Sequence, residues 1–163
     1  MNFSLSKFAV IAALALPSLT LAQDTEGRRL ALLAFQSIEG AERGFIDKGG
    51  FSTFGSDVFY SMDGDQDDRL SLAEFLSWDY GMLPLAEEAG RAAAYETALR
   101  VVFAFWDRDG DHFITKTEHR QSLNADFLRA DSNHDATLTE DEFTTGFSVM
   151  VALRAAINPA PVE

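Results

Sequence analysis

The chain has 163 residues, no cysteine and a formal net charge of -13, from 13 Lys and Arg against 26 Asp and Glu. Hydrophobic residues make up 47% of it, enough for a folded core, which excludes a wholly disordered acidic tail. The absence of cysteine excludes disulfides, thiolate zinc sites and thiol catalysis. The acid excess argues against nucleic acid or an anionic membrane as a partner. Cations are therefore the partners that this composition favours.

Residues 1–22 have the pattern of a secretory signal sequence. Lys7 precedes an apolar run over residues 8–16, and the small residues Thr20 and Ala22 follow. The run is shorter than the roughly 20 residues that cross a bilayer, so we expect no membrane span. A buried N-terminal helix is the alternative for these residues. We expect cleavage near Ala22 and a secreted or periplasmic protein whose remaining residues, 23–163, carry a net charge of -14.

Three twelve-residue windows, 63–74, 107–118 and 131–142, share one pattern. Each has an acid or amide at positions 1, 3 and 5, a Leu or Ile at position 8, a hydroxyl at position 9 and Glu at position 12. Together they carry -11 of the charge of residues 23–163. The pattern resembles the calcium-binding loop of the EF-hand family, in the form of a secreted bacterial EF-hand protein.

The resemblance implies up to three Ca²⁺ ions held by oxygen atoms. Calcium takes six to eight oxygen ligands, which such a loop supplies from side chains at positions 1, 3 and 5, the carbonyl of position 7 and both carboxylate oxygens of position 12. The expected ligands are Asp63, Asp65, Asp67, Arg69 and Glu74 in the first window; Asp107, Asp109, Asp111, Phe113 and Glu118 in the second; and Asp131, Asn133, Asp135, Thr137 and Glu142 in the third.

A fourth window, residues 39–50, lies 24 residues before position 63 and matches only in part. It has Gly44 at position 6 and Ile46 at position 8, but Arg43 at position 5 and no side-chain oxygen at positions 3 and 12. We interpret it as a degenerate hand that binds no metal; a helix followed by a glycine-rich loop is the alternative. A Phe also stands four residues before each window, at positions 35, 59, 103 and 127.

The expected fold is all-α, with four EF-hands in two lobes and a short two-stranded ribbon between paired loops. Because neighbouring hands usually pair, we expect loop 39–50 to pair with 63–74, and loop 107–118 with 131–142. The predicted organisation is a signal at 1–22, an N-terminal pair over 23–82, a linking helix and C-terminal pair over 83–157, and a tail at 158–163. Helices are expected at 27–38, 53–62, 72–80, 85–106 and 140–156, with two brief helices within 116–130.

Two features depart from the family pattern. Position 6 normally holds Gly with a positive φ, but here it holds Asp68, His112 and Ala136. Each should cost roughly 1 kcal/mol of strain, so we expect micromolar-to-millimolar affinities, weakest at loop 131–142, where Asn133 replaces a carboxylate. His112, His119 and His134 are expected to be exposed loop residues; a transition-metal site built from two of them is the alternative.

The functional prediction is calcium binding with a structural or buffering role. No nucleophile elbow, phosphate loop or zinc-protease motif is present, so we expect no enzyme activity. The alternative is a calcium-dependent interaction module that recruits a protein partner through an apolar surface. Only three Met follow residue 22, which is few for an adaptable target groove.

Overall fold

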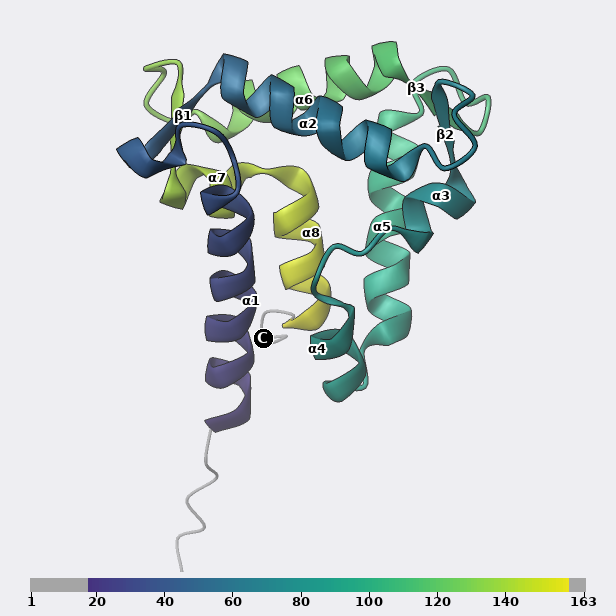
Figure 1. Ribbon diagram of the computed structural model, residues 1–163. Helices are drawn as coiled ribbons and strands as arrows, with labels where there is room; N and C mark the ends of the chain where they lie inside the picture. The colour runs from purple at the N-terminus through teal and green to yellow at the C-terminus, as the bar shows by residue number, and fades with distance from the viewer. Residues whose placement is uncertain (1–17, 159–163) are drawn as a thin grey trace, which may run out of the picture.

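The computed structural model describes residues 18–158, so most of the predicted signal and the tail from residue 159 on lie outside the description. The fold is mostly helical, with two very short ribbons, as expected (Figure 1). Among the described residues, no helix is long and apolar enough to cross a bilayer. The elements are α1 (Ser18–Gln36), η1 (Ala41–Arg43), β1 (Phe45–Asp47), α2 (Lys48–Met62), β2 (Arg69–Ser71), α3 (Leu72–Ser77), α4 (Leu83–Glu88), α5 (Ala92–Trp106), β3 (Phe113–Thr115), α6 (Lys116–Ala130), β4 (Thr137–Thr139), α7 (Glu140–Gly146) and α8 (Ser148–Ile157).

Helices α2 and α6 each connect two successive loops and lie side by side across the molecule (Figure 1). The prediction of two brief helices within 116–130 is wrong, because no Gly or Pro interrupts this segment and α6 runs through it unbroken. Helix α2 is also longer than expected, because it begins at residue 48 rather than 53, where Asp47 caps its first turn. Gly55 allows the two helices to approach closely, since a Cβ there would clash with the side chain of Leu123.

The ribbons join the loops in an order that the sequence did not predict. Strand β1 pairs with β4, so that Ile46 lies opposite Leu138, and β2 pairs with β3, so that Leu70 lies opposite Ile114. The expected pairing of neighbouring loops is therefore wrong. A 15-residue helix is about 22 Å long, so α2 and α6 each hold their own two loops at opposite ends. The loops then pair across the two helices instead.

The aromatic residues that flank the loops follow the same cross-pairing. Around the β1–β4 ribbon, Phe35 contacts Phe143 and Phe51 contacts both Phe127 and Phe143, with ring centroids 5.6–6.4 Å apart. Around the β2–β3 ribbon, Phe59 contacts His119, and Phe75 contacts Phe103 and Trp106, at 5.2–5.9 Å. Each ribbon therefore has its own buried aromatic cluster, built from two loop segments that are distant in sequence.

Two of the longer predicted helices are interrupted. The expected helix 85–106 is divided into α4 and α5 around Gly90, whose φ of +66° breaks the helical path. The expected helix 140–156 is divided into α7 and α8 by Phe147, which has an extended backbone and a buried side chain. Phe147 packs on Phe51 and Phe143, and Gly146 lies so close to Ala130 that a Cβ would clash there, so α7 ends at a glycine followed by a buried ring.

His119 is buried, contrary to the expectation of an exposed loop residue, whereas His112 and His134 are exposed. Its side chain is in the position that Phe occupies after the other three loops, and the residue is only 4% exposed. The ring packs between Phe59 and Trp106, with centroids 5.2 Å from each. Burial among these rings lowers the pKa of His119 to about 4.

His119 therefore makes the free energy of unfolding depend on pH. Below its ordinary pKa of about 6.5 the unfolded chain takes up a proton that the folded chain refuses until about pH 4, so stability falls across this range as pH decreases. Because Phe does not titrate, the free energy of unfolding of His119→Phe should rise relative to that of the wild type by about 2 kcal/mol when the pH is lowered from 7.5 to 5. Urea denaturation of both proteins in calcium-free buffer measures this gain.

The exposed His112→Gln variant is the control and should follow the wild type at both pH values. An advantage of His119→Phe that is the same at both pH values would show that the gain comes from packing alone and would contradict the prediction.

Candidate metal-binding loops

Two of the predicted loops bring acidic side chains within reach of one another. In loop 63–74, oxygen atoms of Asp63, Asp65 and Asp67 all lie within 4.8 Å of one another. In loop 107–118, Asp107, Asp109 and Glu118 do the same. These are the acidic groups among the described residues that can hold a metal ion, and both come from the sequence prediction.

The same network of hydrogen bonds shapes all three acidic loops. The backbone N–H groups at positions 5 and 6 donate to the position 1 carboxylate over 3.0–3.2 Å. The position 5 N–H also donates to the position 3 side chain, over 3.0–3.3 Å. The position 7 N–H donates to the position 5 carboxylate, over 2.9–3.2 Å. These donors turn the side chains at positions 1, 3 and 5 inward from a single tight turn.

The Glu at position 12 joins the two ends of each loop. One carboxylate oxygen accepts from the backbone N–H at position 2, and the other accepts from the N–H and hydroxyl at position 9. The position 9 hydroxyl accepts in return from the N–H at position 12, which completes a capping box at the start of α3, α6 and α7. The Glu is therefore held at the loop by its place in the first helical turn.

These hydrogen bonds favour the ionised form of the position 12 carboxylates. The backbone N–H of Thr139, together with its hydroxyl and Ser132, holds the pKa of Glu142 below its usual range. For Glu118, partial burial raises the pKa, but hydrogen bonds from Thr115 and from the backbone of Arg108 outweigh it and lower the pKa overall. The side chains are thus charged and oriented at neutral pH, as cation ligands must be.

The backbone confirms the expected strain at position 6. Asp68, His112 and Ala136 have φ values of +68°, +71° and +64°. Position 4 is also left-handed, at Gln66, Gly110 and His134, although the sequence pattern did not predict this. Among these six residues only Gly110 has the conformational freedom that a positive φ favours. It is therefore the only one whose residue type indicates the left-handed backbone in the sequence.

Loop 131–142 departs from the other two in its side chains. Asp131, Asp135 and Glu142 do not form a close acidic triad of the kind seen in the other loops. The amide of Asn133 donates to Asp135 over 3.0 Å, so one position 5 oxygen is already bonded. The weaker affinity expected for loop 131–142 stays a prediction.

Loop 39–50 keeps the backbone features of the other loops but not their acidic centre. Gly44 at position 6 has a φ of +83°, and Ile46 at position 8 is fully buried in the ribbon. Asp47 at position 9 caps α2 by accepting from the N–H of Gly50 over 2.9 Å. Arg43 donates to the carbonyl of Gly40 and to Asp47, so a guanidinium lies where an acidic ligand is expected.

The facing loops 63–74 and 107–118 are joined by more than the ribbon. The guanidinium of Arg69 lies 3.9 Å from the ring centre of Phe113, and both residues stand at position 7. Lys116 forms an ion pair with Asp68 across the ribbon and also lies over the ring of Tyr60. Two cations thus contribute positive charge between two clusters of carboxylates. The predicted carbonyl ligands Arg69, Phe113 and Thr137 are the first residues of β2, β3 and β4.

Comparison with known proteins finds no matching family model, curated protein or solved structure. The metal-ligand roles therefore remain predictions that rest on the sequence pattern and the loop geometry.

The left-handed backbone at position 6 gives a direct test of loop strain. Replacing Ala136 by Gly removes a penalty of about 1 kcal/mol and should raise both the stability of the chain and the calcium affinity of loop 131–142. Urea denaturation in chelator and calorimetric calcium titration measure the two effects.

The control is Ala104→Gly on the exposed face of α5. This variant should lower the free energy of unfolding by about 1 kcal/mol, because a helix disfavours Gly. A destabilised Ala136→Gly variant would contradict the strain that we assign to this loop.

Proposed function

We propose that this chain is an EF-hand protein that binds calcium ions at loops 63–74, 107–118 and 131–142, in the periplasm or outside the cell. Its role is structural or buffering rather than enzymatic. The observation that carries the proposal is the hydrogen-bond network repeated in all three loops, which orients the oxygen atoms of positions 1, 3, 5 and 12 around one turn. An all-oxygen ligand set suits a hard cation such as calcium.

Charge neutralisation supplies the reason why calcium would stabilise the protein. The three loops hold -11 of the net charge of residues 23–163, so their carboxylates repel one another when no cation is present. Three calcium ions would reduce the charge of this segment from -14 to -8. An ion that binds only the folded state raises stability through ligand linkage.

The cross-pairing divides the three sites into a coupled pair and a single site. Loops 63–74 and 107–118 share the β2–β3 ribbon, the Arg69–Phe113 contact and the Lys116–Asp68 ion pair. Loop 131–142 shares its ribbon with loop 39–50, which has Arg43 in place of an acidic ligand. We therefore expect cooperative binding between the first two sites and independent binding at the third.

Single Glu→Gln replacements at position 12 test both the sites and their coupling. Calorimetric titration of residues 23–163 should give three calcium sites, and Glu74→Gln, Glu118→Gln and Glu142→Gln should each remove one. Glu118→Gln should also weaken the site at 63–74 by about 5- to 20-fold, a coupling free energy of about 1–2 kcal/mol. Glu142→Gln should leave that site unchanged.

The control is Glu96→Gln, which removes a carboxylate that is paired with Arg100 on α5, away from the loops. Titration of the wild type with no heat and no change in thermal unfolding would contradict calcium binding. Coupling between loops 107–118 and 131–142, in place of 63–74, would contradict the assigned pairs.

A calcium-dependent interaction module is the second candidate, and a central apolar pocket favours it. A pocket of about 390 Å³ lies between α1, α2, α8 and the segment after α3. Its lining includes Leu33, Phe54, Trp78, Trp106 and Met150, of which Leu33 is exposed. If calcium widens this pocket, an apolar dye should bind more strongly with calcium than with chelator. Equal dye fluorescence in both conditions favours the buffering role.

A further inference from the structure

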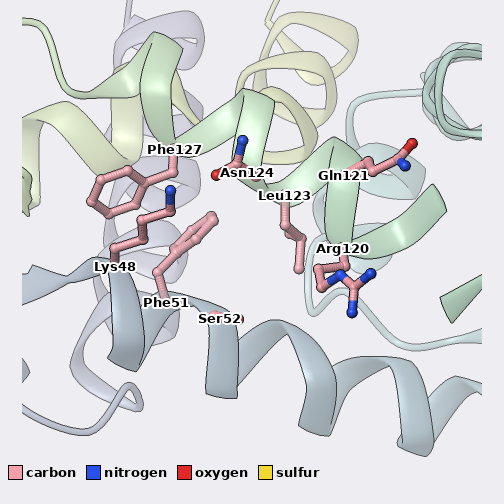
Figure 2. A pocket seen from close by; sticks show the side chains of 8 residues that line it. All are labelled: Lys48, Phe51, Ser52, Arg120, Gln121, Leu123, Asn124 and Phe127. Atoms are coloured by element: carbon pink, nitrogen blue, oxygen red, sulfur yellow. The ribbon is translucent and has the colours of Figure 1, made fainter. Parts of the chain in front are cut away.

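A second pocket, between helices α2 and α6, has a basic rim. It has a volume of about 330 Å³ and is lined from α2 and α6 alone. Figure 2 shows Lys48 extending from α2 toward Phe127 and Asn124 on α6, with Arg120 beyond Leu123 toward the other end. Its lining comprises Lys48, Phe51, Ser52, Arg120, Gln121, Leu123, Asn124 and Phe127.

The charge of this pocket is opposite to that of the protein as a whole. No acidic residue lines it, although the chain has twice as many acidic as basic residues. An adjoining, smaller pocket between the same helices is lined by Arg120 and Lys116 and has no acidic residue either. The groove between α2 and α6 is therefore a basic strip on an acidic molecule, and it attracts anions locally.

The two basic side chains of this pocket, Lys48 and Arg120, have no ion-pair or carbonyl partner within the described part of the protein. Most basic side chains in residues 26–158 form an ion pair or donate to a carbonyl. Within this range, the basic side chains with neither kind of partner are Lys48, Arg108 and Arg120, and two of these three line one pocket. The hydroxyl of Ser52 and the amides of Gln121 and Asn124 have no side-chain hydrogen bond there either. The polar side chains around this cavity are thus exposed and available to a ligand.

The floor of the pocket is apolar. Phe51 and Phe127 are almost fully buried, with ring centroids 5.6 Å apart, and Leu123 is buried beside them. A fully hydrated inorganic anion would gain nothing from such a floor, whereas a carboxylate attached to an aromatic or aliphatic group would bury that group on it. The ammonium of Lys48 at one end of the pocket and the guanidinium of Arg120 toward the other both attract the carboxylate.

We propose that this pocket binds organic carboxylates with an apolar body. Such a group belongs either to a free small acid or to the C-terminal residue of a peptide. The site is distinct from the predicted calcium sites, because none of its lining residues is a predicted calcium ligand.

The experiment uses 4-phenylbutyrate and a short peptide that ends in Phe with a free carboxylate. Each is titrated into residues 23–163 in Tris buffer with calcium, by calorimetry and by NMR of the Asn124 and Gln121 side-chain amides. We expect binding of at least one probe, with affinity reduced about tenfold in Lys48→Gln and in Arg120→Gln, the loss of one charge-assisted contact. The probe that binds more tightly identifies the source of the carboxylate.

Two controls separate this site from general attraction. Arg108→Gln removes an unpaired cation that does not line the pocket and should leave the affinity unchanged. The neutral analogue 4-phenylbutanol should bind at least tenfold more weakly than 4-phenylbutyrate. No binding of either carboxylate, equal binding of the alcohol, or an equal loss in Arg108→Gln would overturn the proposal. Thermal unfolding of each variant verifies that it is folded.

Discussion

The fold depends on one constraint, which is that helices α2 and α6 each belong to two loops at once. Each helix is a rigid rod of 15 residues that ends one loop and begins the next. Since a helix rises about 1.5 Å per residue, two successive loops cannot meet through the helix that joins them. The strand edges of the loops still need partners, and the antiparallel arrangement of α2 and α6 supplies them from the other half of the chain.

That constraint also organises the core and the charges. The flanking aromatic residues form one cluster at each end of the α2–α6 pair, so each ribbon packs on side chains from two segments that are distant in sequence. At one end, two acidic loops face each other, and Arg69 and Lys116 lie between them as positive charges. At the other end, an acidic loop faces one with an arginine, so repulsion across that ribbon is smaller.

The loop without an acidic centre therefore has a structural place in the fold. Its ribbon residue Ile46 is as fully buried as Leu138, its partner across the strand pair. The guanidinium of Arg43 donates to the carbonyl of Gly40 and to the carboxylate of Asp47, so these hydrogen bonds stabilise the turn without a metal ion. Loop 131–142 thus pairs with a partner whose shape does not depend on metal binding.

The sequence by itself determined the loops, because the spacing of the acidic residues, the buried residue at position 8 and the capping Glu are local features that act within twelve residues. It also determined the register of the degenerate loop, through Gly44 and Ile46. Only the tertiary structure decided which loops pair, because pairing depends on the length and packing of α2 and α6. It also decided that His119 is buried and that Lys48 and Arg120 line one pocket, since both depend on side chains brought together from distant segments.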